Sequence, residues 1–243
     1  MRSHWKWMSV FLICLAASLF SKQASWKVFK NETIDLMETV PGWCSNEKAL
    51  LMMDVIKENK CKCCVEIGVF SGKSLLPIAK ALQYNKKGTV CAIDAWDPSE
   101  VVKGFNPSDS DYTWWGKQDF NLFYDNTSKL IKNNKLNKFC VLVKATSHVA
   151  SYQFDNETID FIHFDGNHNE EFAFQDILDY YPKVKNGGFI LLNDPNWKSL
   201  KLSLVFLLER ADLISPFSPS AAYFLFRKNI QREENANILM IYE

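Results

Sequence analysis

The stretch CCVEIGVFSGKS, residues 63–74, decides the fold. Its apolar first half, Cys63 to Ile67, predicts a short buried strand, and the amphipathic pattern that continues to about Tyr84 predicts a helix. Gly68 and Gly72 permit a tight turn between the two, and the start of the helix offers N–H groups without partners. The stretch therefore predicts a strand, a binding loop and a helix in succession.

The loop lacks the two common glycine patterns of nucleotide sites. A dinucleotide-binding loop favours Gly-x-Gly-x-x-Gly, but Glu66 occupies the place of the first glycine here, and the two glycines are four residues apart. A phosphate-binding P-loop needs a glycine five residues before Gly72, where the chain has Ile67. Because a carboxylate suits a cation better than a pyrophosphate, the loop predicts a positively charged ligand.

Apolar runs and amphipathic segments alternate along the rest of the chain. Besides 63–67, the expected strands cover residues 89–93, 139–144, 159–164, 189–192, 223–226 and 238–242. Helices are expected between 26 and 58 with a break at Pro41, near His148, and at 120–133, 170–181 and 199–210, with a turn at 185–188. This alternation predicts an α/β fold: a Rossmann-like, doubly wound, mostly parallel seven-stranded sheet with an antiparallel C-terminal edge.

Four of the expected strands end in an acid, namely Glu66, Asp94, Asp165 and Asp194. In an open parallel sheet, ligands bind outside the carboxyl ends of the strands, near the point where the strand order reverses. The four acids are therefore expected to share one edge of the sheet and to meet a charged or polyhydroxylated ligand there. Asp94 suits a ribose diol, with a turn or helix cap before Pro98 as the alternative role.

The composition bounds the partners. The 243 residues, 47% of them hydrophobic, suffice for one globular domain with a sizeable core. Lysine plus arginine and aspartate plus glutamate both number 28, so no net charge attracts nucleic acid, and no nucleic-acid partner is expected. The cysteines at 61, 63, 64, 91 and 140 lie in or beside expected strands, which predicts inert buried thiols rather than a disulfide framework or a metal site.

The first 25 residues differ from the rest. A positively charged start precedes an apolar run from Met8 to Phe20, and small and polar residues follow through Ser25. This order is typical of a signal peptide, and the run is short for a membrane span, which takes about 20 residues. Residues 1–25 are therefore predicted to be an export signal or membrane anchor, the only membrane contact expected, and residues 26–243 the folded domain. A buried N-terminal helix and a cytoplasmic location are the alternatives.

Four motifs together resemble a known family. They are Glu66-x-Gly68-x-x-x-Gly72, Asp94 after its strand, Asp165-Gly166-Asn167-His168, and the run Gly187-Gly188-Phe189-Ile190-Leu191-Leu192-Asn193-Asp194. The set resembles class I S-adenosylmethionine-dependent methyltransferases, and more narrowly the metal-dependent branch that includes catechol and sugar O-methyltransferases. The resemblance covers roughly Cys63 to Asp194.

The resemblance implies S-adenosyl-L-methionine as cofactor and Mg²⁺, or another divalent cation, at the active site. The residues that it places around the cofactor are Glu66, Gly68, Phe70, Ser71, Gly72, Ser74, Asp94, Thr146, Ser147 and Asp165. Within this set Asp94 would bind the ribose, and Thr146 or Ser147 would lie near the adenine. For the metal it implies Asp165 and Asp194, with Asn193 as the better candidate for a third oxygen ligand.

The chemistry expected of such a site centres on His168, three residues after Asp165. A hydroxyl is a weak nucleophile until it loses its proton, and a hard cation held by oxygen ligands lowers the pKa of that proton. Because an imidazole titrates near neutral pH, His168 is expected to accept the proton, with Asp165 as its catalytic partner at the metal. As alternatives, His168 caps a helix or supports a ligand, His163 is a satisfied buried histidine, and Thr146 and Ser147 cap the short helix after them.

The expected activity is therefore methyl transfer to a hydroxyl oxygen of a small-molecule or glycan acceptor. The aromatic segment Trp96–Trp115, with Phe105, Tyr112 and Trp114, is expected either to face that acceptor or to pack against the sheet. Two other functions stay open: a non-catalytic methyltransferase-like binding module, and a nicotinamide-dependent oxidoreductase, against which Glu66 argues. The oligomeric state, a homo-oligomer included, also stays open.

Overall fold

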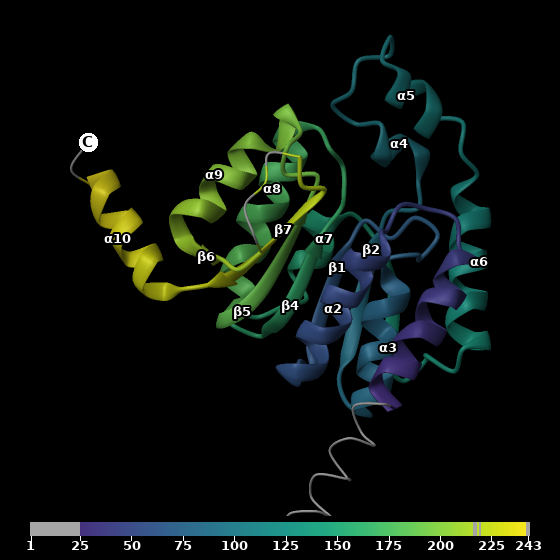
Figure 1. Cartoon of the computed structure of the whole chain (residues 1–243). Coiled ribbons are helices and arrows are strands. Elements are labelled where there is room, and N and C mark those ends of the chain that lie inside the picture. Colours follow the sequence, from purple (N-terminus) through teal and green to yellow (C-terminus); the bar gives the residue numbers. More distant parts are fainter. Residues whose placement is uncertain (1–24, 216–217, 219, 242–243) are drawn as a thin grey trace, which may run out of the picture.

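A computed structural model describes residues 25–215, 218 and 220–241 (Figure 1). The predicted export signal or anchor over residues 1–25 lies outside the described residues apart from Ser25. Within the described part of the chain, no helix is both long enough and apolar enough to cross a membrane.

Seven strands form one sheet. They are β1 (Cys63–Ile67), β2 (Thr89–Asp94), β3 (Cys140–Lys144), β4 (Ile159–Phe164), β5 (Val184–Asn193), β6 (Ala211–Leu213) and β7 (Tyr223–Lys228), in the spatial order β3-β2-β1-β4-β5-β7-β6. The first five strands run parallel, and β7 pairs antiparallel with both β5 and β6. The predicted α/β class and the mostly parallel sheet with an antiparallel C-terminal edge are confirmed. The strand order reverses between β1 and β4, which fixes where a ligand cleft is expected.

Helices cover both faces of this sheet (Figure 1). A helix over residues 25–38, α2 (Asn46–Glu58), α3 (Leu75–Asn85) and α6 (Phe120–Asn133) cover one face, and α7 (Ser147–Ser151), α8 (Glu170–Tyr180) and α9 (Lys201–Arg210) cover the other. The short helices α4 (Pro98–Val101) and α5 (Ser110–Trp115) lie beyond one end of the sheet, and α10 (Ile230–Ile241) follows β7.

Alternation along the strands divides the buried apolar residues into two cores. Cys64 and Phe161 belong to the core under α2 and α3, whereas their neighbours Val65 and Ile162 belong to the core under α8 and α9. All four side chains are fully buried. Because strands buried on both faces carry continuous apolar runs, this arrangement explains why the central strands were recognisable from the sequence.

The predicted last strand, residues 238–242, is wrong. Residues up to Ile241 form α10, and the edge strand is instead β6, which directly follows α9; Tyr242 lies outside the described residues. Asn229 caps the N-terminus of α10, because its side chain accepts a hydrogen bond from the Gln231 N–H. A short apolar run alone cannot distinguish a strand from a helix, and here the polar run before it has already started a helix.

The predicted turn at 185–188 lies inside β5 rather than before it. Val184 pairs with Ile159, but Phe189 pairs with Phe161, so β5 bulges between these two points. Gly187 has a φ of +78°, and a Cβ on Gly188 would lie 2.8 Å from Val184 Cγ1. The two glycines therefore make a bulge that a bulkier residue would not fit.

Candidate functional site

A cleft of about 1210 Å³ opens at the carboxyl ends of the parallel strands. Of the four strand-end acids, Asp94, Asp165 and Asp194 line it. Glu66 is fully buried and lies behind the cleft wall. The structure thus brings together segments that are far apart in the sequence, as expected for the switch point of a doubly wound sheet.

The glycine loop after β1 packs tightly against the end of β4. A Cβ on Gly68 would lie 1.9 Å from the Asp165 carbonyl oxygen, and the φ of Gly68 is +81°. Asp165 N also donates to the Ile67 carbonyl oxygen at 2.9 Å. Because only glycine fits such an approach, Gly68 sets the distance between the loop and the Asp165 segment.

Asp94 holds the loop in shape. Its Oδ2 accepts hydrogen bonds from the N–H groups of Val69 and Phe70, both at 2.9 Å, and its Oδ1 accepts from Trp96 N at 2.7 Å. Trp96 in turn donates from Nε1 to the Phe70 carbonyl oxygen at 2.9 Å. Phe70 has a φ of +51°, a left-handed conformation that a bulky residue rarely adopts without such support. The sequence predicted a ribose ligand for this carboxylate but not its role as a brace.

The predicted cofactor residues divide into two groups. Those that line the cleft are Gly68, Phe70, Ser74, Asp94, Thr146, Ser147 and Asp165. Those outside its lining are Glu66, Ser71 and Gly72. Ser71 is buried inside the loop, and Gly72 packs against Thr127 of α6, which a Cβ would meet at 3.1 Å. The second group therefore shapes the loop from behind.

Glu66 and His163 form a buried pair beneath the loop. Glu66 Oε1 lies 3.0 Å from His163 Nδ1, and both side chains are fully buried. Burial raises the pKa of Glu66 to about 8, against a hydrogen bond from Ser74 that lowers it, and burial also lowers the pKa of His163 well below its ordinary value. Burial therefore disfavours the charged form of both groups, as expected in a water-free interior.

The residues after β3 have local partners. Thr146 caps α7, with its side-chain oxygen accepting from Val149 N, and Ser147 Oγ donates to the Asp176 carboxylate of α8. Burial raises the pKa of Asp176 to about 7, while the hydrogen bond from Ser147 opposes that shift. His148 is exposed at the cleft rim and binds Asp179 Oδ2 at 2.8 Å. Both residues thus line the cleft, and the capping alternative holds for Thr146 but not for Ser147, whose hydroxyl binds Asp176 instead.

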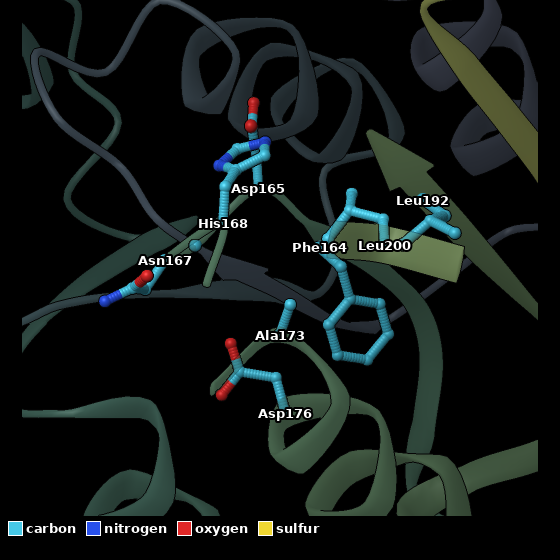
Figure 2. Close-up of a pocket in the computed structure, with 9 residues that line it drawn as sticks. Phe164, Asp165, Asn167, His168, Ala173, Asp176, Leu192 and Leu200 are labelled. Carbon is cyan, nitrogen blue, oxygen red and sulfur yellow. The ribbon is translucent and has the colours of Figure 1, made fainter. Parts of the chain in front are cut away.

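Asp165, His168 and Asp194 form a cluster in which one ligand atom from each residue lies within 4.8 Å of the others. His168 Nε2 lies 3.3 Å from Asp194 Oδ2, and the imidazole ring packs 4.9 Å from the Trp197 ring. Burial lowers the pKa of His168, but the neighbouring carboxylates of Asp194 and Asp165 outweigh it and leave the pKa above its ordinary value. Figure 2 shows the Asp165 carboxylate beside the His168 ring, and the Asp176 side chain projecting from α8.

Lys48 also reaches this cluster. It lies on α2, which covers the face of the sheet opposite to α8. Its Nζ donates to Asn193 Oδ1 at 2.7 Å and lies 3.6 Å from Asp165 Oδ2. Asn193 Nδ2 donates to Asp165 Oδ1 at 2.8 Å and to Asp194 Oδ2 at 2.9 Å. Asn193 therefore bridges one ammonium and two carboxylates, and its oxygen points at Lys48.

The cluster fits a divalent cation in its donor types. Two carboxylates and an imidazole suit such an ion, and His168 Nε2 lacks an aligned hydrogen-bond partner among the described residues. Asp194 has a φ of +45°, which is uncommon for a non-glycine residue and aims this segment at the cluster. Asp165 and Asp194 are the residues that could hold the ion, whereas Asn193 could contribute its oxygen only if its amide turned away from Lys48.

Aromatic rings form the outer wall of the cleft. Trp114 and Trp115 of α5 lie 4.6 Å apart, and Trp43, which precedes α2, lies 5.6 Å from Trp114. Phe70 of the glycine loop packs 5.6 Å from Trp115. Of the segment predicted to face the acceptor or to pack against the sheet, Phe105, Trp114 and Trp115 line the cleft, and Trp115 also packs against the core under α2 and α3. Tyr112 is not in the lining.

Sequence reasoning missed Lys48, Trp43, Asp176 and Trp197. One signal could have found Lys48: it lies four residues before Met52 and eight before Ile56, so it stands on the apolar face of its helix. A charged residue in that position is rarely buried without a partner. Trp43, Asp176 and Trp197 carry no such signal, because their places depend on how distant segments fold together.

Comparison with known proteins places these features in context. The model of a family described as a methyltransferase domain matches residues 65–195, more than half of the chain. This range contains the glycine loop, Asp94, the Asp165–His168 segment and Asp194. Among curated proteins, none matches the chain.

Solved structures share the fold at low sequence identity. The methyltransferase PaMTH1 of Podospora anserina, solved with S-adenosylhomocysteine (SAH), is 14% identical with a TM-score of 0.56, and the match covers 83% of this chain and 88% of that one. An O-methyltransferase of Bacillus cereus, also in complex with SAH, is 14% identical with a TM-score of 0.55, covering 83% and 90%. The O-methyltransferase NovP is 16% identical with a TM-score of 0.57, covering 75% and 78%.

Proposed function

We propose that this chain, which belongs to the methyltransferase domain family, transfers a methyl group from S-adenosylmethionine to a hydroxyl oxygen of a small molecule or a glycan. One observation carries the proposal. The glycine loop, the braced carboxylate of Asp94 and the Asp165–His168–Asp194 cluster line a single cleft at the switch point of the sheet. The O-methyltransferases of similar fold, two of the three neighbours above, support this choice of reaction.

The donor half of the cleft lies on the glycine loop. Gly68 lets the backbone approach closely, and Asp94, while bracing the loop, keeps oxygen lone pairs for a diol. Ser147, His148 and Asp176 stand at the end where an adenine would lie. S-adenosylmethionine supplies a methyl carbon activated by a positively charged sulfur. The SAH found in two structural neighbours supports this choice of donor.

The acceptor half lies at the Asp165–His168–Asp194 cluster. Asp165 and Asp194 would hold a divalent cation, which would lower the pKa of an acceptor hydroxyl beside it. His168 takes the hydroxyl proton as the oxygen–methyl bond forms and the sulfur–methyl bond breaks. The imidazole ring packs 4.9 Å from the ring of Trp197, which supports its orientation.

Binding and turnover together test the proposal. Isothermal titration calorimetry is expected to show one SAH bound per chain, and labelled S-adenosylmethionine is expected to methylate at least one hydroxyl in a panel of phenols and sugars. Addition of Mg²⁺ or Mn²⁺ is expected to raise the rate, and EDTA to lower it.

Each outcome separates this function from the alternatives. Absence of SAH and S-adenosylmethionine binding would remove the proposal. Binding without transfer to any hydroxyl would favour a non-catalytic binding module, and transfer unaffected by EDTA would favour a metal-free methyltransferase.

A further inference from the structure

The candidate metal cluster contains a cation that belongs to the chain itself. Lys48 is 4% exposed, and its Nζ lies 3.6 Å from Asp165 Oδ2. The same Nζ donates to Asn193 Oδ1, the oxygen that the family resemblance made the better candidate for a third metal ligand. An ammonium therefore occupies the approach to two of the expected ligand residues.

The position of Lys48 is built into the fold. Ser45 caps α2 by accepting a hydrogen bond from Lys48 N, so the lysine stands in the first turn of the helix. Met52 and Ile56, on the same helix face, are fully buried, so the start of α2 is anchored to the core and Lys48 points at β5. The ammonium is therefore held near the carboxylates by packing and not by chance contact of a surface chain.

The surroundings of the cluster make the ammonium a partner of the Asp165 carboxylate. Asn193 Nδ2 donates to the carboxylates of both Asp165 and Asp194. Lys48 pairs with Asp165 from a buried position, where solvent screens the interaction less than at a surface. A divalent cation that approaches the same carboxylates meets a fixed positive charge and an amide turned the wrong way.

We propose that Lys48 is a tethered cation that competes with a divalent metal ion for the Asp165 carboxylate and so keeps metal binding at the Asp165–Asp194 pair weak and reversible. The proposal deepens the metal-assisted function above and rests on it for the assignment of the cluster as a metal centre. When a metal ion binds, Lys48 releases Asn193, whose amide can then turn its oxygen toward the ion. When the ion leaves, the ammonium binds Asn193 Oδ1 again, and the Asn193 amide returns to its bridge between the two carboxylates.

Direct measurement of metal affinity tests the competition. Mn²⁺ is titrated into the full chain, and free Mn²⁺ is followed by electron paramagnetic resonance. Lys48→Met removes the charge and keeps the buried stem, and Lys48→Gln removes the charge but keeps a polar partner for Asn193. Both variants are expected to bind Mn²⁺ more tightly than the wild type by about tenfold or more, since a fixed charge within a few ångströms is lost.

Two further variants control for trivial causes. Lys48→Arg keeps a positive charge and is expected to leave Mn²⁺ affinity near that of the wild type. Lys73→Met removes a lysine that lines the same cleft but makes no ion pair with these carboxylates among the described residues. It is expected to change Mn²⁺ affinity much less than Lys48→Met does.

Thermal melting gives a second readout that keeps the test decisive if a variant is unstable. Mn²⁺ is expected to raise the melting temperature of Lys48→Met more than that of the wild type, because the ion replaces the missing charge. Unchanged or weaker Mn²⁺ affinity in both neutral variants would overturn the proposal, as would a destabilised variant that Mn²⁺ does not rescue. Failure of the wild type to bind SAH would instead contradict the proposed function. That result would leave the Mn²⁺ comparison standing, because the comparison does not depend on SAH binding.

Discussion

At the scale of single residues, Gly68 controls how closely the glycine loop approaches the end of β4. Gly68→Ala places a Cβ against the Asp165 carbonyl oxygen, in a left-handed backbone that alanine disfavours. We expect the variant to lose roughly 2 kcal/mol or more of unfolding free energy, a cost typical of strain at a special backbone position, and to lose SAH binding. Chemical denaturation and calorimetry measure the two effects.

The matched control for this substitution is Gly116→Ala. Gly116 ends α5 with a φ of −61°, which alanine adopts readily, and a Cβ there would lie 3.0 Å from the Tyr112 carbonyl oxygen, a much less severe contact than the 1.9 Å at Gly68. If the Gly68→Ala and Gly116→Ala variants had the same unfolding free energy and the same SAH affinity, the close approach of the loop to Asp165 would not be required.

His168 is the second residue whose role can be isolated. His168→Gln keeps a polar side chain in the cluster but cannot accept the hydroxyl proton at neutral pH. We expect kcat to fall about 10²–10⁴-fold, the usual contribution of a positioned general base, with SAH affinity unchanged. His148→Gln serves as the control, because His148 also lines the cleft but binds Asp179 at its rim. An equal loss of rate in both variants would argue against His168 as the base.

At the scale of elements, the contact between α7 and α8 carries a buried acid. Asp176 of α8 accepts a hydrogen bond from Ser147 of α7, and burial raises the pKa of Asp176 from 3.8 to about 7. The folded chain therefore binds a proton there that the unfolded chain releases between these two values. The contribution of Asp176 to the free energy of unfolding is therefore fully present below pH 4 and is lost as the pH rises toward 7.

Asp176→Asn tests this contact because asparagine stays neutral at every pH. The difference in unfolding free energy, variant minus wild type, is expected to rise by up to about 1.4 kcal/mol per pH unit between pH 4 and 7 and then to level off. Urea denaturation of both proteins from pH 4 to 9 gives this difference. A difference that does not change with pH would mean that Asp176 is ionised in the folded protein.

Elements also show where prediction from the sequence succeeds. β1, β4 and α6 were predicted with the bounds that the structure has, because the two strands are short, mostly apolar runs with clear ends and α6 has a helical periodicity. β6 was missed because three residues directly after a helix carry too little pattern, and α10 was read as a strand because its apolar end resembles one. In the site, Asp94, Asp165 and Asp194 were predictable as a group because parallel strands end at one edge of the sheet, whereas Glu66 lies outside the cleft lining. The aromatic segment with Phe105 and Trp114 was also expected near the cleft. Lys48 was not, since it comes from a helix whose docking no local pattern specifies.

At the scale of the whole molecule, the cleft depends on both cores at once. Lys48 reaches it from α2 on one face of the sheet, and Asp176 reaches it from α8 on the other. The sheet between them supplies Asp94, Asp165 and Asp194 from strands β2, β4 and β5, at or just after their carboxyl ends. The geometry of the site is therefore a property of the packed fold and is lost when either core opens.

The reactivity of the buried cysteines depends on whether the core under α2 and α3 stays closed. Six cysteines are free in the part of the chain that the structure describes, and Cys61, Cys64 and Cys140 lie in the core under α2 and α3. Burial raises the pKa of Cys61 to about 12 and raises the pKa of Cys64 and Cys140 as well. Since the thiolate is the reactive form, these three groups should react only when the core opens.

Labelling with a thiol reagent measures this opening. In a Cys14→Ser background, which removes the cysteine outside the described residues, the three core thiols are expected to react slowly with Ellman's reagent at pH 8, and all six thiols to react at once in guanidinium chloride. Their slow rate should rise with denaturant in step with global unfolding, because β1 and β3 belong to one sheet and one core. Fast labelling of Cys64 in the native protein would show that the α2 side opens independently, and the cleft built on Lys48 would then open with it.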